Sequence, residues 1–347
     1  MLDEAIIHLG MHKTGTSSIQ DSLRGYDDGT TFYTVLGPDP NHSLAIYTAF
    51  HEDYASHQYW RNAGTPRAQI DARRAEVRRD LAAQLQRGDR QRIVISGEGI
   101  VRLDPAGAAE FIDLVRTHAR AIRIVLYLRD PLGYAASMFE QLVKGGLTKL
   151  PPLIRPGYQA RIDPYRALVG PEAIQLRRFD RSEMTGESVV TDFCDLVGLD
   201  AGRVREVTAN QAMPMEAVKL AYLFNRSNPC SFGDRIVLSA RRHLMQAMAE
   251  AYRGRPKLDK ARFTPLADCS GLDYLKRDWG LTFPGHPVEP GPTIALEGWL
   301  EDMSDVSPDP LDRIMRQAGL TGNYRDLAGK LSRSYYHLIC RAAASGA

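Results

Sequence analysis

The chain has 347 residues, of which 44% are hydrophobic and 25% charged. These values are typical of globular proteins and exclude disordered and fibrous chains, while the length allows one large domain or two ordinary ones. The formal net charge of +2 argues against broad nucleic-acid binding but leaves room for a local basic pocket that holds an anion.

The cysteines are widely spaced and include no Cys-x-x-Cys pair, which predicts neither a zinc site nor a disulfide framework. We expect free thiols in a reducing compartment at Cys194, Cys230, Cys269 and Cys340. The longest largely apolar stretch, 122–128, is far shorter than the roughly 20 residues needed to cross a bilayer. Acidic residues interrupt the N-terminus where a signal peptide would begin. These features predict a cytoplasmic protein with no metal site and no transmembrane segment.

Short apolar runs alternate with helical patterns over roughly the first 200 residues. The predicted strands are 5–9, 91–96, 122–128 and 174–179. The predicted helices are 16–23, 69–87, 105–121, 130–144 and 187–196. This alternation predicts an α/β fold, with a mostly parallel sheet flanked by helices.

The segment 26–66 breaks the alternation with prolines and a cluster of aromatic residues, and we expect one or two short helices there. Beyond residue 210 the pattern is helical, most clearly over 214–225 and 236–253. We therefore predict an α/β core over 1–210, with an excursion at about 26–90, and a mainly helical C-terminal extension over 211–347 packed on it.

The first predicted strand runs directly into the turn "GMHKTGTSS", residues 10–18. In parallel α/β sheets such turns lie at the ligand-binding edge, and a helix that begins there offers backbone N–H groups to an anion. Gly10 and Gly15 permit close approach of the backbone, and Lys13 adds a positive charge. Hydroxyl donors follow at Thr14, Thr16, Ser17 and Ser18. The turn therefore has the chemistry of a phosphate cradle.

The turn is not a Walker loop. That motif places lysine after the second glycine and follows it with a hydroxyl for magnesium, whereas Lys13 precedes Gly15. The alternative interpretation is an ordinary strand-to-helix turn with a surface lysine.

The wording "HLGMHKTGTSSIQ", residues 8–20, resembles the bacterial branch of the sulfotransferases that use 3′-phosphoadenosine 5′-phosphosulfate (PAPS). In that family the 5′-phosphosulfate loop follows the first strand and reads much like K-T-G-T-[ST]. The resemblance implies that the cofactor is held by His12, Lys13, Thr14, Gly15, Thr16, Ser17 and Ser18.

A second motif of the family binds the 3′-phosphate with an arginine at a strand end and a serine eight residues later. In "LYLRDPLGYAASMF" these positions are Arg129 and Ser137. A guanidinium can bind a phosphate through two hydrogen bonds, and a hydroxyl from the next helix can complete the shell. The alternative is that Arg129 pairs with a carboxylate such as Asp130 and that Ser137 only packs.

The resemblance spans about residues 6–198 and implies a three-layer sandwich like that of nucleotide kinases. It also implies in-line transfer of a sulfuryl group to an acceptor oxygen or nitrogen, with release of adenosine 3′,5′-bisphosphate. Lys13 would stabilise the charge that develops on the leaving phosphate, with no magnesium required. The alternatives are a nucleotide kinase or hydrolase on a similar fold and a non-catalytic protein that binds adenosine bisphosphate.

The acceptor needs a general base, and two residues are candidates. Glu98 directly follows the second strand in "ISGEGI", at the same edge as the turn, and related enzymes use glutamate there. His42 in "DPNHSLAIY" is the other, because imidazole titrates near neutral pH. A salt-bridged Glu98 and a surface His42 are the simpler interpretations.

The acceptor itself is not identified by the sequence. A small alcohol, a sugar, a lipid head group and a peptide side chain all stay open, and the even charge distribution disfavours nucleic acid or a long polyanion. Assembly into a homo-oligomer is also left open.

Overall fold

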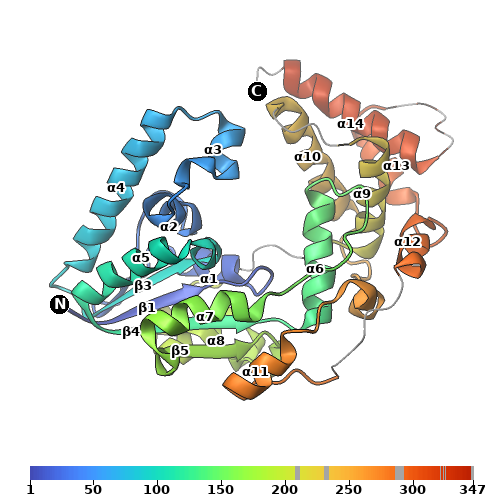
Figure 1. The fold of residues 1–347 in the computed structure, drawn as a ribbon. Coiled ribbons are helices and arrows are strands. Elements are labelled where there is room, and N and C mark those ends of the chain that lie inside the picture. The colour runs from blue at the N-terminus through green and yellow to red at the C-terminus, as the bar shows by residue number, and fades with distance from the viewer. Residues whose placement is uncertain are drawn as a thin grey trace. The chain divides into compact units, whose positions relative to one another are not determined.

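The computed structural model describes residues 1–207, 212–229, 234–285, 293–320, 322, 324 and 326–344. They form two compact units (Figure 1). The sheet unit contains 1–130, 157–207 and 270–285, and the helical unit contains the described residues of 131–156, 211–269 and 287–347.

Within the described residues the sheet unit holds a five-stranded parallel sheet, in the order β2-β3-β1-β4-β5. The strands are β1 (Leu2–Leu9), β2 (Thr31–Tyr33), β3 (Arg92–Gly97), β4 (Ala119–Leu128) and β5 (Ile174–Arg178). β1 is central and buried on both faces because its residues after Glu4 are apolar apart from His8. The predicted mostly parallel sheet flanked by helices is confirmed.

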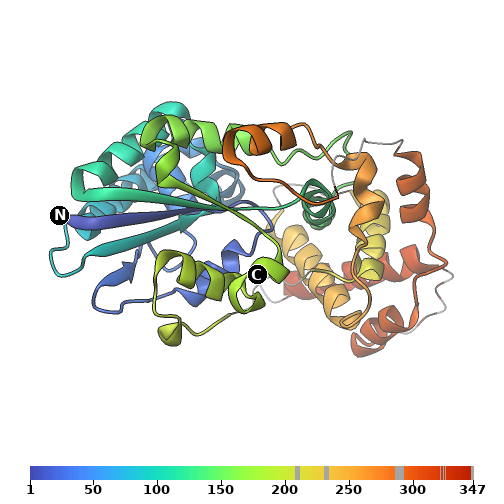
Figure 2. The same ribbon diagram turned by 90° about the horizontal axis from the view of Figure 1, so that it is seen from below.

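Helices cover both faces of this sheet, which makes the unit a three-layer sandwich. Figure 2 shows the blue α1 and yellow-green α8 on one face and α5 with α7 on the other. Ile19 of α1 and Phe193 of α8 join Val125 of β4 in one buried cluster. The helices of the unit are α1 (Thr16–Ser22), α2 (Ser43–Phe50), α3 (Gln58–Ala63), α4 (Arg67–Leu85), α5 (Pro105–His118), α7 (Tyr158–Val169), α8 (Val189–Val197) and α11 (Leu272–Trp279). The unit's short 3-10 helices are η1 (Tyr54–Ser56), η2 (Glu98–Arg102), η3 (Pro171–Ala173), η4 (Arg181–Glu183), η5 (Thr185–Glu187) and η6 (Ala201–Arg203).

The structure corrects the sequence prediction at three elements. The helix predicted over 105–121 ends at His118, because β4 already pairs with β1 from Ala119 onward. The strand β2 and the helix α7 were not predicted. β2 spans only three residues, and α7 carries Pro164 in its interior, so neither leaves a clear periodic signal.

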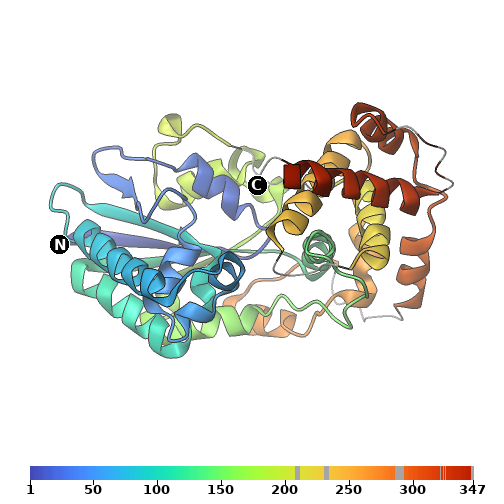
Figure 3. The same ribbon diagram turned by 90° about the horizontal axis from the view of Figure 1, so that it is seen from above.

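The helical unit consists of helices packed on one another, in line with the helical pattern predicted beyond residue 210. Its α-helices are α6 (Pro131–Lys144), α9 (Met215–Ser227), α10 (Arg235–Ala251), α12 (Ile294–Glu301), α13 (Asp309–Gln317) and α14 (Leu327–Ala344), with the 3-10 helix η7 (Lys260–Leu266). Figure 3 shows α14 beside α10 in this unit. Lys219 of α9 is fully buried, where it pairs with Asp305 and its ammonium lies 4.9 Å from the centre of the Trp299 ring.

Three of the cysteines, Cys194, Cys269 and Cys340, are free thiols, and Cys230 lies outside the described residues. Among the described helices, none combines the length and the apolar character that crossing a bilayer requires.

Candidate functional site

Three neighbouring strands of the sheet unit, β3, β1 and β4, end at the same edge, where parallel sheets bind ligands. The segments that follow these strands carry the predicted site residues. Arg129, after β4, donates from Nη1 to the carbonyl oxygen of Lys13, after β1, at 2.8 Å. Glu98, after β3, lies with its Oε2 2.7 Å from Nδ1 of His12, also after β1. The structure therefore brings His12, Lys13, Glu98 and Arg129 together.

The loop after β1 has an unusual backbone. Lys13 has φ +67° and Gly15 has φ +75°, whereas Thr14 between them has negative φ. Left-handed residues alternating with a right-handed one are the backbone pattern of the concavities in which successive N–H groups bind an anion. A non-glycine residue in the left-handed region costs roughly 1 kcal/mol, so the fold holds Lys13 in a strained conformation.

Gly10 is required by close packing. A Cβ atom at this position would lie 2.5 Å from Cγ2 of Thr16 and 2.8 Å from Cγ of Glu98. The backbone of the loop therefore runs directly against the side chain of Glu98, which fixes that carboxylate beside the loop.

The hydroxyls of the loop differ in what they can offer an anion. Thr14 is fully buried and donates to the carbonyl oxygen of Met11 at 2.7 Å, and Thr16 makes a longer contact of 3.4 Å with the same oxygen. Both close the loop rather than face outward. Ser17 is partly exposed and Ser18 is buried.

The helix that follows contributes little to an anion site by itself. α1 spans only seven residues, and no side chain caps its N-terminus at Gly15. So short a helix has a weak macrodipole. The groups at this edge that could hold an anion are the amides of the loop, Lys13 and Arg129.

Arg129 is held in place at several points. Its carbonyl oxygen accepts a hydrogen bond from the hydroxyl of Tyr158, and its guanidinium carbon lies 5.6 Å from the centre of the Phe179 ring. Ser137, the other half of the predicted 3′-phosphate motif, lies partly exposed on α6, which belongs to the helical unit.

Glu98 and His12 form a hydrogen-bonded pair at the mouth of the loop. The His12 side chain is 39% exposed and the Glu98 side chain 22% exposed. Glu98 begins η2, and the next residue anchors this turn because the N–H of Gly99 donates to Oγ of Ser43 at 2.9 Å. The carboxylate is therefore fixed but still reachable from solvent.

His42 is fully buried, and both of its ring nitrogens are used within the fold. Nδ1 accepts a hydrogen bond from the backbone N–H of Ser96 at 3.1 Å, so Nε2 carries the proton and donates to the carbonyl oxygen of Thr34 at 2.9 Å. Burial lowers the pKa of His42 to about 4. Neither ring nitrogen is available to take a proton from an acceptor substrate, so the structure does not support His42 as the general base.

The last two residues of β5, Arg177 and Arg178, also form ion pairs within the fold. Arg177 pairs with the buried carboxylate of Asp192, which accepts a further hydrogen bond from the hydroxyl of Tyr127 at 2.6 Å. Arg178 pairs with Glu183 at 2.6 Å. These ion pairs stabilise the end of β5.

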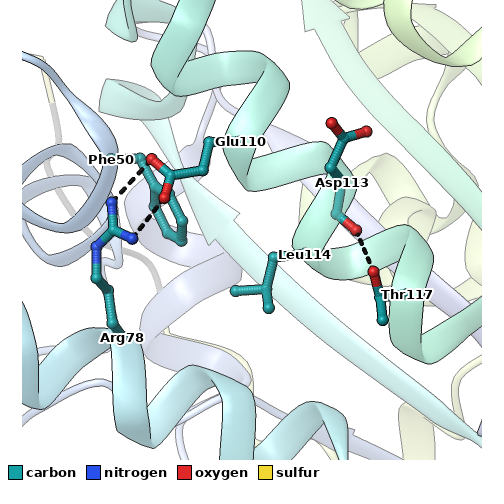
Figure 4. Close-up of a pocket in the computed structure, with 6 residues that line it drawn as sticks. All are labelled: Phe50, Arg78, Glu110, Asp113, Leu114 and Thr117. Carbon is teal, nitrogen blue, oxygen red and sulfur yellow. Dashed lines mark hydrogen bonds and ion pairs between the residues drawn. The ribbon is translucent and has the colours of Figure 1, made fainter.

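An open pocket lies elsewhere on the sheet unit, between α4 and α5. It is lined by Phe50, Arg78, Glu110, Asp113, Leu114 and Thr117. Figure 4 shows that Arg78 reaches both carboxylate oxygens of Glu110. With its guanidinium already paired, this pocket lacks the donors that an anion would need.

The pairing of His12 with Glu98 was not predicted from the sequence. Each residue closely follows a predicted strand, and this position indicates the ligand-binding edge of the sheet. However, His12 and Glu98 are 86 positions apart in the sequence. Only the strand order, in which β3 lies next to β1, places the two side chains together.

Comparisons with known proteins add little. No family model matches the chain, and no curated protein matches it. Among solved structures, the chain is similar to a sulfotransferase from Alicyclobacillus acidocaldarius, with 19% sequence identity and a TM-score of 0.37. The alignment covers 70% of this chain and 96% of that one. A TM-score this low supports no inference about activity, so the function has to be argued from the chain's own residues.

Proposed function

We propose that the chain is a sulfotransferase that takes a sulfuryl group from PAPS and transfers it to an acceptor hydroxyl or amine. The observation that supports this most is the 2.8 Å hydrogen bond from Arg129 to the carbonyl oxygen of Lys13. It joins two cation-bearing strand ends at one edge of the sheet, as a nucleotide with two separate phosphate groups requires.

In this proposal the loop after β1 holds the 5′-phosphosulfate through its amides, Lys13 and the exposed Ser17. The alternating φ values and the two glycines fit a group that approaches the backbone closely. Arg129 holds the 3′-phosphate, and a role for Ser137 stays a prediction of the sequence motif. Thr14 and Thr16 act indirectly, by keeping the loop closed on Met11.

Bound PAPS supplies an activated sulfuryl group, whose sulfur–oxygen bond to the phosphate breaks as the new bond to the acceptor forms. Lys13 stabilises the charge that develops on the leaving phosphate oxygen. The Glu98–His12 pair takes the proton that the acceptor loses. Lys13 and the Glu98–His12 pair both lie at the loop after β1. Lys13 therefore stabilises the leaving group, and the pair activates the acceptor.

The acceptor class is a small alcohol, a sugar or a lipid head group. The excursion between β1 and β3 is the part of the sheet unit that can shape its pocket, because Ser43 of α2 contacts the turn that carries Glu98.

Calorimetric titration tests the proposal, with adenosine 3′,5′-bisphosphate, 5′-AMP and ATP–magnesium as ligands. We expect micromolar-range binding of the bisphosphate, weaker binding of 5′-AMP and little binding of ATP–magnesium. Arg129→Ala should weaken bisphosphate binding at least tenfold, since a charged hydrogen bond contributes roughly 1.5–3 kcal/mol.

Because Arg129 also holds the loop, the 5′-AMP titration serves as the control. If Arg129 binds the 3′-phosphate, its loss should weaken the bisphosphate far more than 5′-AMP; if it only supports the loop, both should weaken equally. Arg79→Ala, an exposed arginine on α4, should change neither affinity. Preferential binding of ATP–magnesium would replace the proposal with a kinase, and binding without any transfer from PAPS would leave a nucleotide-binding protein.

A further inference from the structure

Three histidines, His8, His12 and His42, lie near the carboxyl edge of the sheet. They differ in their exposure to solvent and in whether a ring nitrogen is left without a hydrogen bond. His42 has both ring nitrogens in hydrogen bonds, as described above. His8 is fully buried in β1, with Nδ1 2.9 Å from Oγ of Ser96. Neither ring can be reached by an acceptor molecule.

His12 is different because it is 39% exposed and uses only one ring nitrogen. Its Nδ1 lies 2.7 Å from a carboxylate oxygen of Glu98. An ionised carboxylate can only accept a hydrogen bond, so Nδ1 must carry the proton. In the neutral ring the lone pair then lies on Nε2, for which the described part of the chain provides no hydrogen-bond partner.

We propose that His12 is the catalytic base of the transfer and that Glu98 is its positioning residue. This rests on the proposed sulfotransferase function and assigns roles within the pair that the function needs. The arrangement is that of a carboxylate that fixes the tautomer and orientation of an imidazole whose other nitrogen faces the substrate.

The chemistry of the two groups supports this division. Glu98 has one carboxylate oxygen committed to His12, and its side chain is the less exposed of the two. Imidazole is the side chain best suited to accept and release a proton near neutral pH. His12 also directly precedes Lys13, so the base is one residue from the group that stabilises the leaving phosphate.

The step balances as follows. The acceptor O–H bond breaks and its proton goes to Nε2 of His12, while the oxygen forms a bond to sulfur. The sulfur–oxygen bond to the 5′-phosphate breaks, and its electron pair stays on the phosphate of the leaving adenosine 3′,5′-bisphosphate. Glu98 stabilises the imidazolium and stays ionised throughout.

The first measurement is nitrogen NMR on the full-length protein labelled at histidine, in the presence of adenosine 3′,5′-bisphosphate. We expect the signal that disappears in His12→Gln to report a proton on Nδ1 and a lone pair on Nε2. In Glu98→Ala the same signal should change to the tautomer with the proton on Nε2, which is the form that an isolated imidazole prefers in water. An Nε2-protonated His12 in the wild type would overturn the proposal.

The second measurement separates binding from turnover. His12→Gln should bind the bisphosphate within about threefold of the wild type but transfer sulfuryl groups at least about 100-fold more slowly, the usual contribution of a general base. Glu98→Ala should lower kcat by less, with KM for PAPS unchanged. His243→Gln, an exposed histidine on α10, should behave as wild type.

The two proposals fail in different ways. If the wild type binds no bisphosphate, the sulfotransferase function fails and the assignment of the base fails with it. If the wild type binds and transfers while His12→Gln keeps its rate and Glu98→Ala loses it, Glu98 is the base and only the present assignment is wrong.

Discussion

His42 and His8 are imidazoles built into the interior, and Ser96 connects them. The backbone N–H of Ser96 donates to His42, and its hydroxyl lies 2.9 Å from Nδ1 of His8. Burial lowers the pKa of both rings, to about 4 for His42 and about 3 for His8. The neutral rings are therefore part of the folded state, and their protonation opposes folding.

This predicts an acid-sensitive fold. The pKa of His42 is about 4 in the native state and 6.5 in the unfolded chain. As pH falls below 6.5, His42 binds a proton in the unfolded chain but stays neutral in the native state. The contribution of His42 is thus fully present above pH 6.5 and is lost progressively down to about pH 4, by roughly 3 kcal/mol. His8, with a pKa of about 3, adds a loss of similar size over the same range. The free energy of unfolding in urea, measured across this range, should show the loss.

His42→Gln should remove about half of this loss, because an amide can accept from Ser96 and donate to Thr34 without titrating, whereas His8 still titrates. The exposed His243→Gln should leave the profile unchanged. If wild type and His42→Gln lose stability in parallel as pH falls, burial of His42 is not the cause.

At this scale the sequence predicts the types of residue at the site better than their roles. Lys13, Glu98 and Arg129 were all expected at one edge, and they lie there. His42 looked like an exposed loop histidine beside a proline and an asparagine. Its burial depends on Ser96, 54 positions away, and such a contact leaves no local signal.

Among the elements, the loop after β1 depends on the absence of a side chain at Gly10. Gly10→Ala should displace the side chains of Thr16 and Glu98, since the added Cβ would lie under 3 Å from both of them. We expect a loss of about 1–3 kcal/mol in stability and weaker binding of adenosine 3′,5′-bisphosphate. Thermal unfolding and calorimetric titration of the variant measure the two effects.

Gly88→Ala is the matched control, because a Cβ there would meet nothing within 4 Å. It should stay within about 0.5 kcal/mol of the wild type. Equal behaviour of the two variants would show that the loop can absorb a methyl group at Gly10.

The elements also show what periodicity can and cannot predict. The four predicted strands exist. The first three are largely apolar and buried in the sheet, whereas β5 is an edge strand of which only Ile174 is buried. The edge strand β2 has only three residues and escapes detection. More importantly, periodicity does not indicate the order of the strands. The site depends on that order, since β3 and β4 flank β1 and contribute Glu98 and Arg129.

For the whole molecule, the contribution of Ser137 to ligand binding is a prediction of the sequence motif alone. Arg129 belongs to the sheet unit and Ser137 to the helical unit. We expect Ser137→Ala to weaken binding of the bisphosphate about fivefold, the effect of one hydrogen bond of about 1 kcal/mol. The binding of 5′-AMP should not change, because it lacks the 3′-phosphate.

Ser239→Ala, a partly exposed serine on α10 of the same unit, is the control and should have no effect. If Ser137→Ala also binds normally, the prediction that Ser137 holds the 3′-phosphate is wrong. Hydrogen exchange can then show where the ligand protects the chain: at 100 times Kd it stabilises the folded state by about 2.7 kcal/mol.

The left-handed backbone at Lys13 has a consequence for how this chain tolerates change. Glycine relieves the strain at that position and Asn or Asp relieves part of it, whereas most other residues keep it. A mutational scan scored on abundance should therefore rank glycine among the mildest replacements for Lys13, and the same scan scored on transfer should rank it among the most damaging. Selection for stability therefore favours glycine at position 13, whereas selection for turnover favours lysine.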